Sequence, residues 1–93
     1  MTVLHPSRAY AQWLLCRLAT LRDLHRYGRP EDIRSLASDL AQSAHGMGHR
    51  EVEAAAQAIR RCADHPAALE AAIEILRRIV KRAAERTLRN AAA

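Results

Sequence analysis

The sequence is poor in the residues that β-rich, disulfide-linked and membrane-spanning proteins use most. Its 93 residues include three glycines, three prolines, two tyrosines, one tryptophan and no phenylalanine. Few glycines and prolines leave few turns, and the β-branched residues that favour strands are sparse. A core without phenylalanine must be built mainly from Leu, Ile and Ala, which suits closely packed helices. These scarcities predict an all-α chain.

Cysteines and long apolar runs are also lacking. Cys16 and Cys62 lie far apart and form no Cys-x-x-Cys or Cys/His ligand spacing, so neither a disulfide scaffold nor a metal site is predicted. No run approaches the roughly 20 apolar residues that cross a bilayer, and no charged-then-apolar leader opens the chain. We therefore expect a cytoplasmic protein that contacts no membrane and holds no metal or cofactor.

Basic residues are plentiful, although lysine is nearly absent. The formal net charge is +5, and Arg supplies fourteen of the fifteen basic side chains. Arg binds phosphate and carboxylate groups in a bidentate way. The basic half of the last predicted helix has no aromatic residues between its arginines, so base stacking there is not supported. Nucleic acid is therefore not the expected partner, and a solvated face is the simpler interpretation.

Apolar residues recur at helical spacing in four segments. The segments are separated by short turns at Gly28, around Gly48, and at Asp64-His65-Pro66. They predict helices over residues 6–27, 31–45, 50–63 and 66–90. Four amphipathic helices with such short connections favour one domain over residues 1–93, an antiparallel up-down four-helix bundle.

The second of these segments has a small, polar outer side. Around Leu40, a helix would place apolar residues on one stripe and Ser, Gln, Arg and His on the other. Gly46 and Gly48 follow, and we expect both to stop the helix, because glycine readily adopts positive φ.

This segment resembles the signature of the bacterial histidine phosphotransfer (HPt) domain. In that family an exposed His is followed three residues later by Lys and four residues later by Gly. Here Ser38 falls at the His, Ala41 at the Lys and Gln42 at the Gly. The positions that fit the family are Leu40, Ser43, Ala44, Met47 and Gly48. The positions that shape the helix therefore match the family pattern, whereas the three positions that carry its phosphotransfer chemistry do not.

The resemblance implies an HPt-like fold without the usual reaction, and hence no enzyme. A serine hydroxyl needs an adjacent base before it can attack phosphorus. We therefore predict a binding module of two-component signalling that docks a receiver domain or a histidine kinase. The predicted partner-binding residues are Arg34, Ser38, Gln42 and His45, with Arg50 and Arg61 at the rim.

Three alternatives stay open. His45 lies seven residues after Ser38 on the same predicted face and could itself accept phosphate. The basic fourth helix, with Arg78 and Arg82, could bind nucleic acid. An apolar ridge at Ile75 and Ile79 could join two copies as a homodimer.

Overall fold

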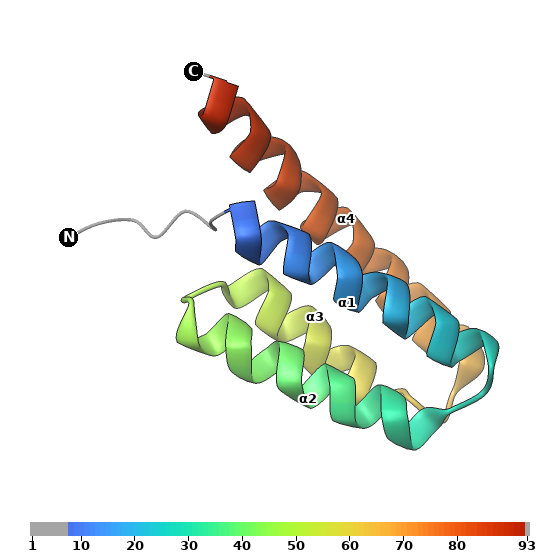
Figure 1. Ribbon diagram of the computed structural model, residues 1–93. Helices are drawn as coiled ribbons and strands as arrows, with labels where there is room; N and C mark the ends of the chain where they lie inside the picture. The colour runs from blue at the N-terminus through green and yellow to red at the C-terminus, as the bar shows by residue number, and fades with distance from the viewer. Residues whose placement is uncertain (1–7, 93) are drawn as a thin grey trace.

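The computed structural model describes the backbone of residues 8–92 and the side chains of residues 8–87. It contains four helices (Figure 1): α1 (Arg8–Arg26), α2 (Pro30–Gly46), α3 (Arg50–Arg61) and α4 (Pro66–Ala92). No strand occurs within this part of the chain. The prediction of an all-α, four-helix fold is confirmed.

The helices form a closed ring of neighbours. Each helix contacts the next one in the chain, and α4 returns to contact α1. Within the described residues no Cα atoms of the diagonal pairs, α1 with α3 and α2 with α4, come within 8 Å of each other. In Figure 1 the chain runs to the right along α1, returns along α2, and repeats this course along α3 and α4. Each helix therefore has two neighbours and one side left for solvent.

Every helix turns one apolar stripe toward a common core. The largest fully buried side chains include Leu14, Leu21, Leu40, Ile59 and Leu76. No polar or charged residue is buried among the described residues. The apolar stripe of the sequence thus becomes the core of the bundle, and the polar side chains are left to the surface.

The predicted helix boundaries agree with the structure to within two residues wherever they can be compared. The predicted start of the first helix at residue 6 lies outside the described residues. The third helix ends at Arg61, two residues before the predicted end, because the backbone turns before Pro66. In that turn the His65 N–H donates to the Cys62 carbonyl at 2.9 Å.

The first two helices end in the same way. The N–H of Gly48 donates to His45 O at 3.1 Å and that of His49 donates to Ala44 O at 2.8 Å. This pair of bonds is the Schellman motif, and α1 closes likewise around Gly28. Gly28 and Gly48 have φ of 65° and 69°. The prediction that Gly46 also stops the helix is wrong, because Gly46 is still part of α2 and its φ is not positive.

Helix α4 is the longest element, with 27 residues. In Figure 1 its C-terminal part projects beyond the other three helices. The last buried core residue of α4 among those with described side chains is Ala83.

Candidate functional site

The outer side of α2 carries most of the residues that the sequence predicts for partner binding. Its buried positions recur at helical spacing from Ile33 to Ala44, and this spacing turns the intervening residues outward. Ser38 and Gln42 are exposed one turn apart. We call the outward residues Arg34, Ser38, Gln42 and His45 the α2 face.

Arg34 lies at the start of this face and is already engaged. Its Nη1 donates to Asp64 Oδ2 at 2.8 Å, across to the turn between α3 and α4. Both side chains remain partly open to solvent. Arg34 therefore serves first as a link between α2 and the end of α3, and only its exposed edge is left for a partner.

His45 lies at the opposite end of the face. Its side chain is 78% exposed, and its Nδ1 lies 3.2 Å from Glu53 Oε2 on α3. In the neutral tautomer that has its proton on Nδ1, this N–H donates to the carboxylate and Nε2 is the unprotonated nitrogen. The Glu53 contact thus fixes one orientation of an exposed imidazole.

Ser38 stands at the middle of the face, where the HPt pattern has its histidine. Among the described residues, none forms a hydrogen bond with the Ser38 hydroxyl. A serine without a neighbouring base is a poor nucleophile. In the part of the chain that the structure describes, no base is hydrogen-bonded to this exposed hydroxyl.

Ala41, which stands where the family pattern has lysine, does not belong to this surface. Only 4% of Ala41 is exposed, and it is part of the hydrophobic core. The register of α2 therefore turns this position inward. A lysine here would have to bend its stem out of the core to reach solvent.

Arg50 and Arg61, the two predicted rim residues, are not brought together. They occupy the first and last positions of α3, about 16 Å apart along the helix axis. Both are exposed and form no ion pair with any described residue. Each can extend the charge of the α2 face at one end only.

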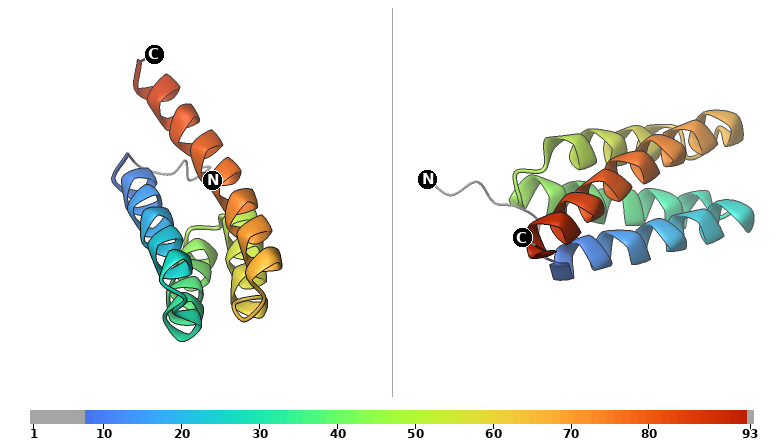
Figure 2. Two further views of the ribbon diagram at one scale, coloured as in Figure 1. Left: turned by 90° about the vertical axis from the view of Figure 1, so that its right-hand side faces the viewer. Right: turned by 90° about the horizontal axis from the view of Figure 1, so that it is seen from above.

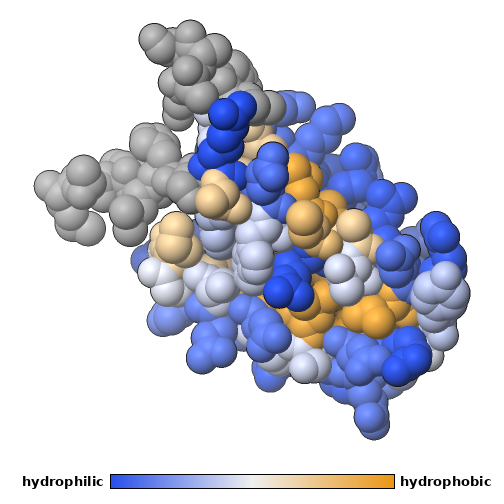
Figure 3. Space-filling model, viewed as in Figure 1, coloured by the Kyte–Doolittle hydropathy of each residue, from blue (hydrophilic) through white to orange (hydrophobic). Residues whose placement is uncertain are grey.

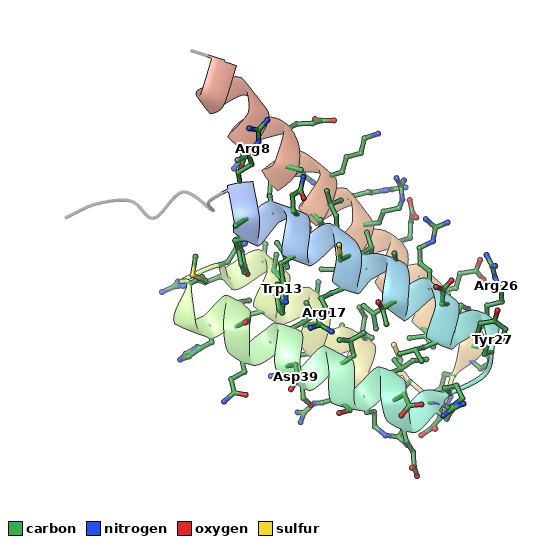
Figure 4. The ribbon with its side chains drawn as sticks, viewed as in Figure 1. Arg8, Trp13, Arg17, Arg26, Tyr27 and Asp39 are labelled. Atoms are coloured by element: carbon green, nitrogen blue, oxygen red, sulfur yellow. The ribbon has the colours of Figure 1, made fainter. Side chains whose placement is uncertain are left out.

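A second feature beside the α2 face was only partly visible in the sequence. The rings of Tyr10 and Trp13 stack with centroids 5.9 Å apart, and the Arg17 guanidinium lies 5.4 Å from the Trp13 ring centroid. Trp13 and Arg17 point toward α2, where Asp39 lies opposite (Figure 4). With Gln42 and Ser43 they line a shallow depression of about 390 Å³. We call this depression the α1–α2 groove.

The sequence held one signal for this groove. Trp13 and Arg17 are four residues apart, the spacing at which helical side chains meet, and Arg attracted to a Trp face is a common pairing. The position of Asp39 follows from tertiary packing alone. Figure 3 shows hydrophobic residues along part of the seam between α1 and α2, and a second hydrophobic patch above α1, on the side of α4.

The remaining predictions concern metals, membranes and nucleic acid. No group of three or more potential metal ligands is found within the described residues. None of the helices in this part of the chain has the length and apolarity needed to cross a bilayer. On α4, Arg78 and Arg82 are exposed, and Arg78 lies 3.5 Å from Glu74. Binding of nucleic acid by this helix stays a prediction.

The chain was also compared with known proteins. It matches no protein-family model, no curated protein and no solved structure.

Proposed function

We propose that the chain is a protein-binding module that docks its partner on the α2 face. The observation that carries the proposal is the exposed Ser38 hydroxyl in the middle of the polar α2 face, where the HPt pattern has its phospho-accepting histidine. The resemblance points to a receiver domain or a histidine kinase as the partner. Docking without relay is the mode that a serine at this position favours.

The neighbouring α1–α2 groove supports docking from the side of α1. Trp and Arg are the residue types that most often dominate binding energy at protein interfaces. Trp13 is half-buried, and the guanidinium of Arg17 lies near its ring. Gln42 belongs to both the groove and the α2 face, so the two surfaces are continuous. A partner that binds over Ser38 could therefore also contact Trp13 on the same side of the bundle.

The test is a binding titration against individual receiver domains and histidine kinases of the organism that encodes the chain. Ser38→Arg and Gln42→Arg add bulk at exposed positions and should weaken binding at least about tenfold while the helix content stays constant. Ala68→Arg adds the same bulk and charge at an exposed position of α4, diagonally opposite α2, so it is the matched control and should bind like the natural chain. Unchanged binding of the Ser38 and Gln42 variants would refute the α2 face as the docking surface.

A second candidate function rests on the His45–Glu53 contact. In the neutral tautomer whose Nδ1–H donates to Glu53, Nε2 carries the lone pair that would attack the phosphorus of a receiver's aspartyl phosphate. The P–O bond to the aspartate breaks, and the receiver is left with a free carboxylate. The α2 face would then relay phosphate through His45.

Incubation with a phosphorylated receiver separates the two functions. Relay predicts an acid-labile phosphoryl label on the chain that is lost in His45→Ala, reduced in Glu53→Gln and retained in Ser38→Ala. Docking alone predicts no label in any of the variants. Binding without label would therefore support the first function and refute the second.

A further inference from the structure

A groove between α1 and α4 lies away from the α2 face. Arg22 and Arg26 line one wall, Glu70, Glu74 and Arg77 line the other, and Ile73 lies between them, in a volume of about 700 Å³. The right panel of Figure 2 shows the end of α1 and the start of α4, where these residues lie, set apart from each other in the view from above. We call it the α1–α4 groove.

The two walls carry opposite charges. Arg22 and Arg26 are four residues apart on α1, and so are Glu70 and Glu74 on α4, so each pair projects along one edge of its helix. Both arginines are exposed, and Arg26 projects from the end of α1 in Figure 4. The α1 wall is therefore basic, and the α4 wall, with two carboxylates and Arg77, keeps one net negative charge.

The charges of the two walls do not neutralise one another. Among the described residues, Arg22, Arg26 and Glu70 take part in no ion pair. Glu74 is held on its own helix, with Oε1 2.7 Å from Arg77 Nη2. This hydrogen-bonded contact with Arg77 lowers the pKa of Glu74 to about 2, so the carboxylate is ionised at neutral pH. The walls remain two separate rows of charge at the same height in the bundle.

Such a surface is complementary to itself. A two-fold axis parallel to the helices and lying in the interface places the α1 wall of one copy against the α4 wall of the other, and the reverse. Each Arg22 and Arg26 then faces Glu70 and Glu74 of the second copy. We propose that the α1–α4 groove is the contact by which two copies of this chain associate.

Charge also argues against the other classes of occupant. An anionic partner such as nucleic acid would meet Glu70 and Glu74, and a cationic one would meet Arg22 and Arg26. An apolar helix would have to desolvate both rows. A second copy brings Arg22 and Arg26 opposite Glu70 and Glu74 and leaves the α2 face open, because α2 lies diagonally opposite α4 in the ring of helices. The proposal therefore goes beyond the docking function and does not depend on it.

Sedimentation equilibrium of the full chain tests the proposal. At low salt the mean mass should rise from monomer toward dimer as the concentration increases, and 0.5 M NaCl should weaken the association. Arg22→Glu combined with Arg26→Glu gives two acidic walls, and Glu70→Arg makes the α4 wall largely basic. Each variant alone should raise the dimer dissociation constant at least tenfold, because every substitution acts twice across a two-fold axis.

Mixing the two variants is the sharpest measurement. The chain with Arg22→Glu and Arg26→Glu is complementary in charge to the chain with Glu70→Arg. Their mixture should therefore form a heterodimer although neither variant forms a homodimer. The control combines Arg8→Glu with Arg60→Glu, which changes the net charge equally outside the groove and should leave association unchanged. Circular dichroism establishes that every variant keeps its helix content.

Any of the following results would overturn the proposal: a monomer over the whole concentration range, undiminished association of the charge variants, no association in their mixture, or loss of association in the control. The predicted ridge is tested in parallel by Ile75→Lys, because Ile75 is 55% exposed and does not line the groove. Dissociation by this variant alone would assign the contact to the ridge and refute the groove.

Discussion

Arg34 and Asp64 join the beginning of α2 to the end of α3, with 2.8 Å between Nη1 and Oδ2. The two residues are 30 positions apart in the sequence, so the pair reports on tertiary structure rather than on a single helix. The Arg34 and Asp64 side chains are 38% and 64% exposed. Solvent therefore screens their attraction.

A double-mutant cycle with Arg34→Ala and Asp64→Ala should give a coupling energy below about 1 kcal/mol, as is usual for exposed ion pairs. Urea unfolding of the four chains measures it. Arg61 is exposed and forms no ion pair within the part of the chain that the structure describes, so Arg61→Ala should change the free energy of unfolding by less than about 0.5 kcal/mol. A coupling above about 2 kcal/mol would mean that the pair is shielded from water.

Positions 38 and 41 offer a matched test of how α2 is turned. Lysine at position 38 would extend into solvent, and we expect Ser38→Lys to change the free energy of unfolding by less than about 0.5 kcal/mol. Lysine at position 41 would overpack the core and draw its stem past apolar neighbours, at a cost of about 1–3 kcal/mol. Equal unfolding energies for the two variants would contradict the register of α2.

The same two positions show how far the sequence could be interpreted. Ser38 was predicted to face solvent because apolar residues around Leu40 define the opposite side of the helix, and periodicity alone is sufficient for this. Burial of Ala41 could not be predicted in this way, because position 41 lies at the edge of the apolar stripe. Only the packing of α3 against α2 decides whether this position is buried. Alanine gives little indication of its own environment.

Contacts between helices were the part of the site that the sequence could predict least. The pairing of His45 with Glu53 joins two helices, and the approach of Arg17 to Asp39 depends on how α1 lies against α2. Periodicity orients each helix about its own axis, but it does not fix the height at which neighbouring helices meet. The residues of the α2 face could therefore be predicted, whereas the charges beside them could not.

Gly46 and Gly48 form a second matched pair. Gly48 has a φ of 69°, a conformation that costs a residue with a side chain about 1–2 kcal/mol. Gly46 is helical, and an added Cβ there would meet no atom within 4 Å. Gly48→Ala should therefore destabilise the chain by about 1 kcal/mol or more, whereas Gly46→Ala should be neutral or stabilise it by up to about 1 kcal/mol. Thermal unfolding of both variants measures the difference. The reverse order would place the left-handed residue at position 46.

His49 lies at the turn before α3, next to Tyr10 of α1, and the charge of Arg86 on α4 acts on it. Its ring is tilted against that of Tyr10, with centroids 6.3 Å apart, and its Nδ1 is buried without a hydrogen-bond partner among the described residues. Burial lowers the pKa of His49 below its ordinary value of 6.5; Glu51 opposes this shift and Arg86 adds to it. The folded chain thus favours the neutral imidazole.

Stability should consequently fall in mildly acidic solution. Because the pKa of His49 is lower in the folded chain, the unfolded chain binds more protons between the two pKa values. The free energy of unfolding then decreases as the pH falls through about 6.5 toward the folded pKa, and this contribution is complete below it. Urea unfolding from pH 8 to pH 5 should show a smaller decrease for His49→Gln than for the natural chain. His65→Gln, which alters an exposed histidine, is the control. Equal pH dependence of the His49 variant and the natural chain would show that this imidazole is protonated as readily in the fold as in the unfolded chain.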